Sequence, residues 1–100
     1  MVRGSTPKHI FKLPISTSTV KKVLITYEQL GRKVLEKTEK DVQMQDDTIT
    51  LQLAQAETLL FKEKQTARIQ LKVLTNSGDL LPSQIISVSV GEILNEEELL

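Results

Sequence analysis

The chain has 100 residues, of which 39% are hydrophobic and 26% charged, a balance typical of one folded domain and not of a disordered chain. Lysine plus arginine and aspartate plus glutamate both number 13, so the net charge is zero and no overall field favours nucleic acid or an anionic membrane. The absence of cysteine excludes disulfides and thiolate chemistry. With 3% aromatic residues and no tryptophan, few side chains could stack on bases or sugars.

Targeting signals are not evident in the sequence. The basic residue near the start is not followed by the apolar run of a signal peptide, and no segment approaches the roughly 20 apolar residues of a membrane-spanning helix. We therefore expect no signal peptide, no membrane association, and a cytoplasmic location during expression.

The first expected element is a strand near the N-terminus. In "RGSTPKHIFKLP", residues 3–14, Pro7 leads into a strand built around His9 to Leu13 and Pro14 ends it. Proline removes a backbone donor, so this arrangement suits an edge strand. Residues 1–7 then form an N-terminal arm before a domain spanning residues 8–91.

Alternating hydrophobic and polar residues predict four further strands, each with one buried face. They lie in "KKVLITYEQ", "TITLQL", "ARIQLKVLT" and "IISVSV". The side chains expected to face the core are Val23, Ile25, Tyr27, Ile49, Leu51, Leu53, Ala67, Ile69, Leu71, Val73, Ile86, Val88 and Val90.

The segments between these strands contain residues typical of turns. Gly31 favours a short hairpin, after which residues 33–37 return antiparallel, and "QDD" at 45–47 separates the next pair of strands. "TNSGDLLPS" contains a strong turn signal. "AQAETLLFKEKQ" predicts a single helical turn at a corner between two sheets, plugged by Leu60 or Phe61.

Six to seven short strands with frequent turns predict an all-β fold, a single immunoglobulin-like antiparallel β-sandwich. A small open β-barrel is the alternative. The acidic tail, residues 92–100, carries three adjacent glutamates and is expected to be solvated.

No pattern of reactive residues indicates catalysis. His9 is the only histidine, and the aspartate pairs lack calcium-loop spacing, so we predict no catalytic residue and no metal ligand. The stretch Gly4-Ser5-Thr6 lacks the lysine-bearing glycine loop of a phosphate-binding site. We therefore expect a protein that is not an enzyme and has no cofactor and no small-molecule substrate.

Outward-facing hydrophobic residues leave two alternatives: scattered exposed side chains without a role, as is normal for folded proteins, or a surface that binds protein. If the alternation holds, Leu24, Leu74 and Ile85 point away from the core, and several such residues on one sheet face form a patch that a partner covers. Arg3 in the arm and Ile10 in the expected edge strand complete the predicted partner-contact residues.

Four segments of the chain are similar to a known pattern: "RGSTPKHIFKLP", "VLITYEQLGRKVLEKTEKDV", "ITLQLAQAETLLF" and "ARIQLKVLTNSGDLLPSQIISVSVGEIL". Together they resemble a family of short, uncharacterised proteins encoded in phages and prophages of Gram-positive bacteria. Proteins of this kind are similar in layout to the sandwich modules that open baseplate and tail-fibre subunits.

The matching residues fall in three places: Arg3, Gly4, Thr6 and Pro7 at the start, Ile25, Thr26, Tyr27 and Gln29 in the second strand, and Gln55, Glu57, Thr58, Leu59 and Phe61 at the corner. The chain departs at Ala54, where the pattern has threonine, which weakens a hydroxyl cap at that turn. The resemblance implies a non-enzymatic virion or assembly protein, associated with a tail or baseplate, whose partners are other phage proteins or itself. The alternative is a soluble adaptor or host-interaction domain.

Overall fold

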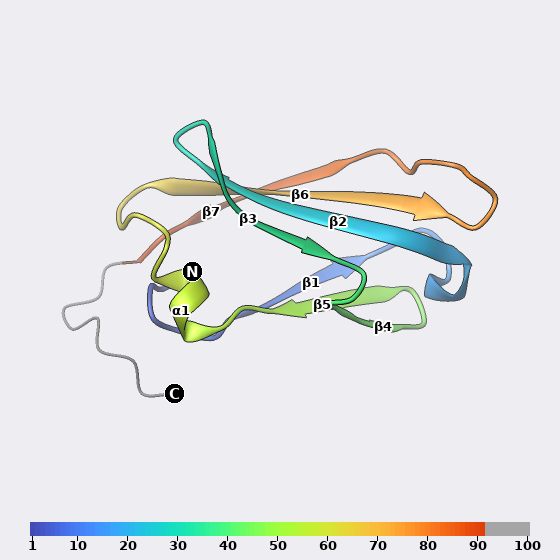
Figure 1. Cartoon of the computed structure of the whole chain (residues 1–100), viewed down its shortest axis with the longest axis horizontal. Helices are drawn as coiled ribbons and strands as arrows, with labels where there is room; N and C mark the ends of the chain where they lie inside the picture. Colours follow the sequence, from blue (N-terminus) through green and yellow to red (C-terminus); the bar gives the residue numbers. More distant parts are fainter. Residues whose placement is uncertain (92–100) are drawn as a thin grey trace.

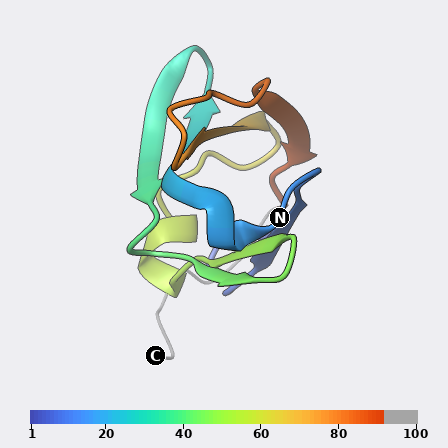
Figure 2. The same cartoon turned by 90° about the vertical axis from the view of Figure 1, so that its right-hand side faces the viewer.

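The computed structural model describes residues 1–91, and the acidic tail predicted at 92–100 lies outside the described residues. The chain folds into two antiparallel sheets packed face to face (Figures 1 and 2). One sheet has the order β1-β5-β4 and the other β3-β2-β6-β7. The strands are β1 (Lys8–Lys12), β2 (Val20–Gln29), β3 (Arg32–Thr38), β4 (Gln43–Gln45), β5 (Thr48–Gln52), β6 (Thr66–Thr75) and β7 (Gln84–Ser89), and the helical turns are η1 (Thr17–Thr19) and α1 (Gln55–Thr58).

The strand order confirms the predicted sandwich. In an immunoglobulin domain, strands B, E and D form part of one sheet and C′, C, F and G the other. The β1-β5-β4 sheet and the β3-β2-β6-β7 sheet follow the same order and the same antiparallel pairing. Within residues 1–91 no strand pairs beside β1 in the position of strand A. The two sheets are separate, so the barrel alternative does not describe this fold.

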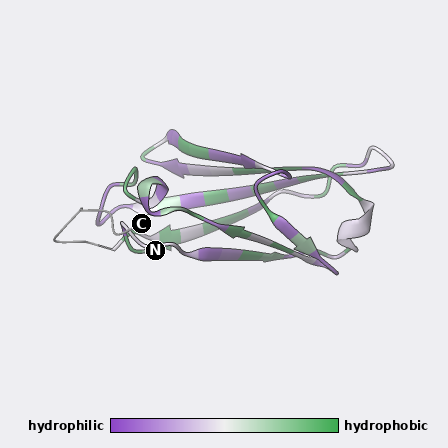
Figure 3. Ribbon diagram, turned by 60° about the horizontal axis from the view of Figure 1, so that its bottom comes forward, coloured by the Kyte–Doolittle hydropathy of each residue, from purple (hydrophilic) through white to green (hydrophobic). Residues whose placement is uncertain are grey.

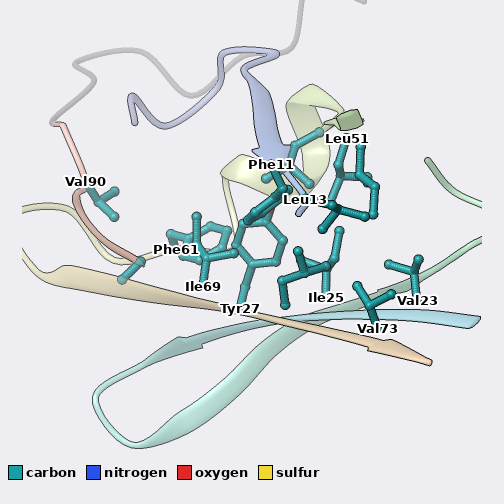
Figure 4. Close-up of a cluster of buried hydrophobic side chains, with 14 residues drawn as sticks. Phe11, Leu13, Val23, Ile25, Tyr27, Leu51, Phe61, Ile69, Val73 and Val90 are labelled. Atoms are coloured by element: carbon teal, nitrogen blue, oxygen red, sulfur yellow. The ribbon is translucent and has the colours of Figure 1, made fainter. Parts of the chain in front are cut away.

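The core lies between the two sheets and comes from the residues that the alternation predicted. Inward side chains of β2, β5 and β6, from Val23 to Val73, are almost completely buried. Along the strands, hydrophobic and hydrophilic residues alternate in Figure 3, and Figure 4 shows side chains of both sheets pointing toward one another. Each of these segments is therefore a strand with one buried face, as its alternation predicted.

Two-residue turns close two of the hairpins, β2–β3 and β4–β5, at the predicted positions. Between β2 and β3, Leu30 and Gly31 both have positive φ, 55° and 74°. Two consecutive residues of this kind match the twist of the flanking strands, and Gly31 adopts the conformation at little steric cost. Asp46, with a φ of 53°, lies in the turn between β4 and β5.

The corner between β5 and β6 is plugged by one of the two residues proposed for it. Phe61 is 1% exposed, whereas Leu60 is 59% exposed. The helical turn α1 begins after Ala54, which has no side-chain acceptor, so the cap comes from the Glu57 carboxylate, which accepts a hydrogen bond from the Ala54 N–H at 2.8 Å. The turn thus keeps half of a capping box without the hydroxyl.

The last strand departs from the prediction of a buried face. Ile86 pairs with the buried Ile69 and so faces the core side, yet it is 41% exposed. The reason is the unequal width of the sheets: β7 is the edge of the four-stranded sheet, and the facing three-stranded sheet has no strand in the A position to cover it. The expectation that Ile86 is a core residue is therefore wrong.

The start of the chain runs alongside the end of β7. Val2 forms a parallel bridge with Gly91, and the N-terminal amine donates a hydrogen bond to the Ser89 carbonyl at 2.7 Å. The Arg3 guanidinium donates to the Leu59 carbonyl at 3.2 Å. The arm predicted for residues 1–7 is therefore packed along the domain. Within residues 1–91, no helix is long and apolar enough to cross a membrane.

Candidate functional site

One short contact between two titratable side chains lies between the two sheets. His9 on β1 faces inward opposite Tyr27 on β2, and the His9 Nδ1 lies 2.6 Å from the Tyr27 hydroxyl. The Tyr27 ring also packs edge-on against Phe61, with ring centroids 5.9 Å apart. Tyr27 is completely buried. The pair therefore links the two sheets through a hydrogen bond within the core.

The environment keeps both members of this pair neutral. Burial, together with the charge of the N-terminal amine, lowers the pKa of His9, and burial followed by the charge of Glu57 raises the pKa of Tyr27. A buried tyrosine of raised pKa is a poor base, and a substrate has no access to its hydroxyl. Among residues 1–91, no group of three or more histidine, aspartate or glutamate side chains is placed to hold a metal ion. The geometry assigns the pair a structural role.

The His9 pKa predicts how stability depends on pH. The folded state lowers the His9 pKa below 6.5, so the unfolded chain binds the proton more readily than the folded chain does. The contribution of His9 to stability is therefore complete above pH 6.5 and is lost as the pH falls from 6.5 toward the lowered pKa of the folded state. Burial raises the pKa of Glu57, but hydrogen bonds from the Ala54 N–H and Lys37 outweigh this effect and lower the pKa overall, below 4.5. Protonation of Glu57 therefore reduces the stability of the fold only below about pH 4.5.

Thermal unfolding followed by circular dichroism at about pH 7.5 and about pH 5.5 checks this expectation. The midpoint falls at the lower pH in the wild type. In His9→Gln, which removes the titrating group, the fall is smaller. An equal fall in both proteins would contradict a role for His9.

The outer face of the four-stranded sheet divides into a charged part and an apolar part. In the charged part, Arg68 lies 3.6 Å from Glu28 and Lys33 lies 2.8 Å from Glu36. Arg68 and Glu28 form an ion pair across β6 and β2, whereas Lys33 and Glu36 both belong to β3, and ion pairs of both kinds are typical of a solvated sheet face. The apolar part begins at Leu24, four residues before Glu28 in β2, toward the other end of the sheet.

The apolar part is a hollow of about 450 Å³. Leu24 of β2 and Leu74 of β6 are diagonal neighbours across the strand pair, because Leu24 pairs with Lys72. Leu80 forms an isolated antiparallel bridge to Leu74 and is 73% exposed. The three leucines belong to one continuous apolar hollow, which we call the leucine hollow.

Charged side chains surround the leucine hollow. Lys22 and Lys72 line it, and Glu39 lies at its rim, where its carboxylate accepts a hydrogen bond from the Val23 N–H at 3.3 Å. An apolar centre with a charged rim is the usual anatomy of a protein interface. The arrangement suits a hydrophobic side chain of a partner.

A larger hollow, of about 540 Å³, lies at the hairpin of β2 and β3. Its walls include the long cationic side chains of Arg32, Lys33 and Lys62, and Lys33 is engaged with Glu36. Ordering such side chains costs conformational entropy, so this hollow is less suited to binding than the leucine hollow.

The structure brings together two of the five predicted partner-contact residues. Leu24 and Leu74 share the leucine hollow, whereas Ile85, 52% exposed, lies on β7 beside Thr26 and Gln70 in a separate, smaller depression. Ile10, 64% exposed, lies on β1 of the other sheet, and Arg3 is held against Leu59.

Sequence reasoning did not include Leu80 among the contact residues. Leu80 stands in a segment whose composition indicates a turn, and its position over Leu74 depends on a bridge that periodicity does not reveal. The signal available was the pair Leu80–Leu81 next to a proline. One member, Leu81, packs partly against the core, so the other points outward.

Comparisons of the chain with protein-family models, with curated proteins and with solved structures found no significant match. A function is therefore inferred from the surface of the domain and from the resemblance described above.

Proposed function

We propose that the chain is a non-enzymatic structural or assembly protein of a phage or prophage, associated with the tail or baseplate, that binds other proteins. The observation that carries the protein-binding part is the leucine hollow, in which Leu80 exposes 73% of its surface. An exposed apolar cluster with a charged rim is costly in water unless a partner covers it. The resemblance to the phage-encoded family supports the phage origin.

The proposed binding mode places a hydrophobic side chain of the partner between Leu24, Leu74 and Leu80. The lysines at the rim, Lys22 and Lys72, then contact polar or acidic groups around that side chain. Interface energy usually concentrates in such a central pocket and not in the rim. A single change at the hollow is therefore expected to have a large effect on binding.

The test uses particles purified from a host in which the prophage is induced. The chain is expected in these particles by mass spectrometry, and Leu80→Lys is expected to lower its incorporation about tenfold or more, because the new charge lies beside Lys22 and Lys72. Leu60→Lys is the matched control, since Leu60 is an exposed leucine away from the hollow. Leu60→Lys is expected to be incorporated like the wild type.

Two results would contradict the proposal. Complete absence of the chain from particles would remove the virion role, and a host protein recovered with the chain, but lost in Leu80→Lys, would then favour the adaptor function. Unchanged incorporation of Leu80→Lys would show that the leucine hollow is not the binding site.

A further inference from the structure

The edges of the two sheets differ in how well they are protected against pairing with another strand. The edge strands β1 and β3 carry several charged side chains, among them Lys8 and Lys12 in β1, and β4 has three residues. Charges and short length are the usual means by which an edge strand avoids pairing. β7, with the sequence QIISVS, is six residues long and has no charged residue.

The hydrogen bonds at the end of β7 show which residues direct their backbone N–H and C=O groups to the open edge. The Ser89 carbonyl accepts from the N-terminal amine, and the Gly91 N–H donates to the Met1 carbonyl, so both residues direct their backbone groups away from β6. In an antiparallel ladder this direction alternates along the strand. Ile85 and Ser87 therefore also direct their N–H and C=O groups to the open edge, and within residues 1–91 no hydrogen bond to these groups is observed.

The side chains of β7 leave hydrophobic surface exposed on both faces of this edge. Ile85, on the outer face, is 52% exposed, and Ile86, on the core side, is 41% exposed. The exposure of Ile86 marks the place where the three-stranded sheet does not reach far enough to cover the four-stranded one. A further strand beside β7 would cover it.

We propose that β7 pairs with β7 of a second copy of the chain, antiparallel and about a two-fold axis centred on Ile86. In this register, Ile85 of each copy lies opposite Ser87 of the other, and each such pair exchanges both of its hydrogen bonds. The two Ile86 side chains meet on the core side. The two four-stranded sheets become one continuous sheet across the dimer.

The hydrogen bonds at the end of β7 argue against a register shifted toward that end. If the two-fold axis passed through Ser87 and not through Ile86, Ile85 would lie opposite Ser89, whose carbonyl already accepts a hydrogen bond from the N-terminal amine. A centre between two residues would place an inward side chain opposite an outward one, which is incompatible with a continuous core face. The register centred on Ile86 uses only the backbone groups that are open.

A second copy is also the occupant that the edges of this chain favour. Pairing of β7 with β1 or β3 of another copy would place the apolar strand beside charged side chains. Pairing of β7 with itself brings two uncharged strands together. This self-association uses a different surface from the leucine hollow, so it is independent of the proposed function.

Analytical ultracentrifugation over a range of concentrations tests the proposal. The mass of the wild type is expected to rise with concentration from 11.2 kDa toward twice that value. Ser87→Pro removes an N–H that points to the open edge and not to β6, so it is expected to give a folded monomer. Ile86→Lys, which puts a charge on the edge, is expected to give the same result.

A single-cysteine variant reports the register directly, because the chain has no cysteine of its own. In a pair without mutual hydrogen bonds the Cα atoms are about 4.5 Å apart, which is within the range that a disulfide spans. Ile86→Cys is therefore expected to form a disulfide-linked dimer on mild oxidation, at a rate at least tenfold above that of Leu60→Cys, an exposed control position.

Either of two results would overturn the inference. The first is a wild-type chain that stays monomeric at concentrations up to about 1 mM, where even weak pairs associate. The second is a dimer that persists in both Ser87→Pro and Ile86→Lys and is not cross-linked through Ile86→Cys, because that dimer would use another surface.

Discussion

Replacing Phe61 by alanine is expected to destabilise the domain by about 3–5 kcal/mol, the usual cost of removing a large aromatic side chain from a packed core. Phe61 is 1% exposed and its ring meets the edge of Tyr27. It stands where the chain crosses from β5 to β6, so the loss affects the packing of both sheets. Urea unfolding followed by circular dichroism measures the change.

Leu60→Ala is the matched control for this prediction. Leu60 is adjacent in sequence and hydrophobic, but it is 59% exposed, and its truncation is expected to cost less than about 0.5 kcal/mol. Equal effects of the two substitutions would mean that the corner is not plugged by Phe61 alone.

The contrast between Leu60 and Phe61 shows the limit of sequence reasoning at this corner. Composition predicted a helical turn with a hydrophobic plug, and the structure has both. Which neighbouring side chain points inward depends on the backbone after Thr58, where the Phe61 N–H donates to the Thr58 carbonyl. That direction is a property of the turn geometry, and no periodicity extends over so few residues.

The strands were predictable where both neighbours in the sheet are present. β2 and β6 lie inside the four-stranded sheet and face the other layer, so their alternation of residue types corresponds directly to burial. β7 has the same alternation, but it lies at an edge, and the burial of Ile86 depends on the width of the opposite sheet. Sheet width is a long-range property that a local pattern does not contain.

The candidate binding surface was predictable only in part for a related reason. Leu24 and Leu74 follow from the alternation of their own strands. Their closeness to one another depends on the register between β2 and β6, and the addition of Leu80 depends on a bridge from a loop. The sequence therefore indicated that hydrophobic residues face outward, while the structure shows which of them form one hollow.

The second large expected effect on stability comes from Gln29. The alternation along β2 places this polar residue on the core side but does not explain why it is buried. It is 5% exposed, and its side-chain amide donates to the carbonyls of Lys62 and Gln65 and accepts from the Lys62 N–H at 2.6 Å. One side chain thus satisfies backbone groups of the loop between the α1 corner and β6, in the manner of an additional strand. Buried groups that lose such a partner are costly.

Gln29→Ala is therefore expected to lower the free energy of unfolding by about 2–3 kcal/mol, and Gln29→Glu by at least as much, because its carboxylate places an acceptor oxygen against the carbonyls of Lys62 and Gln65. Gln52→Ala is the control, since Gln52 makes one exposed hydrogen bond, to the Thr6 carbonyl. Amide hydrogen exchange locates the effect: the Lys62 N–H is expected to exchange faster in Gln29→Ala than in Gln52→Ala, because only the first variant removes the acceptor of this N–H. Equal exchange in both would mean that Gln29 contributes packing alone and that the loop is held by its own backbone.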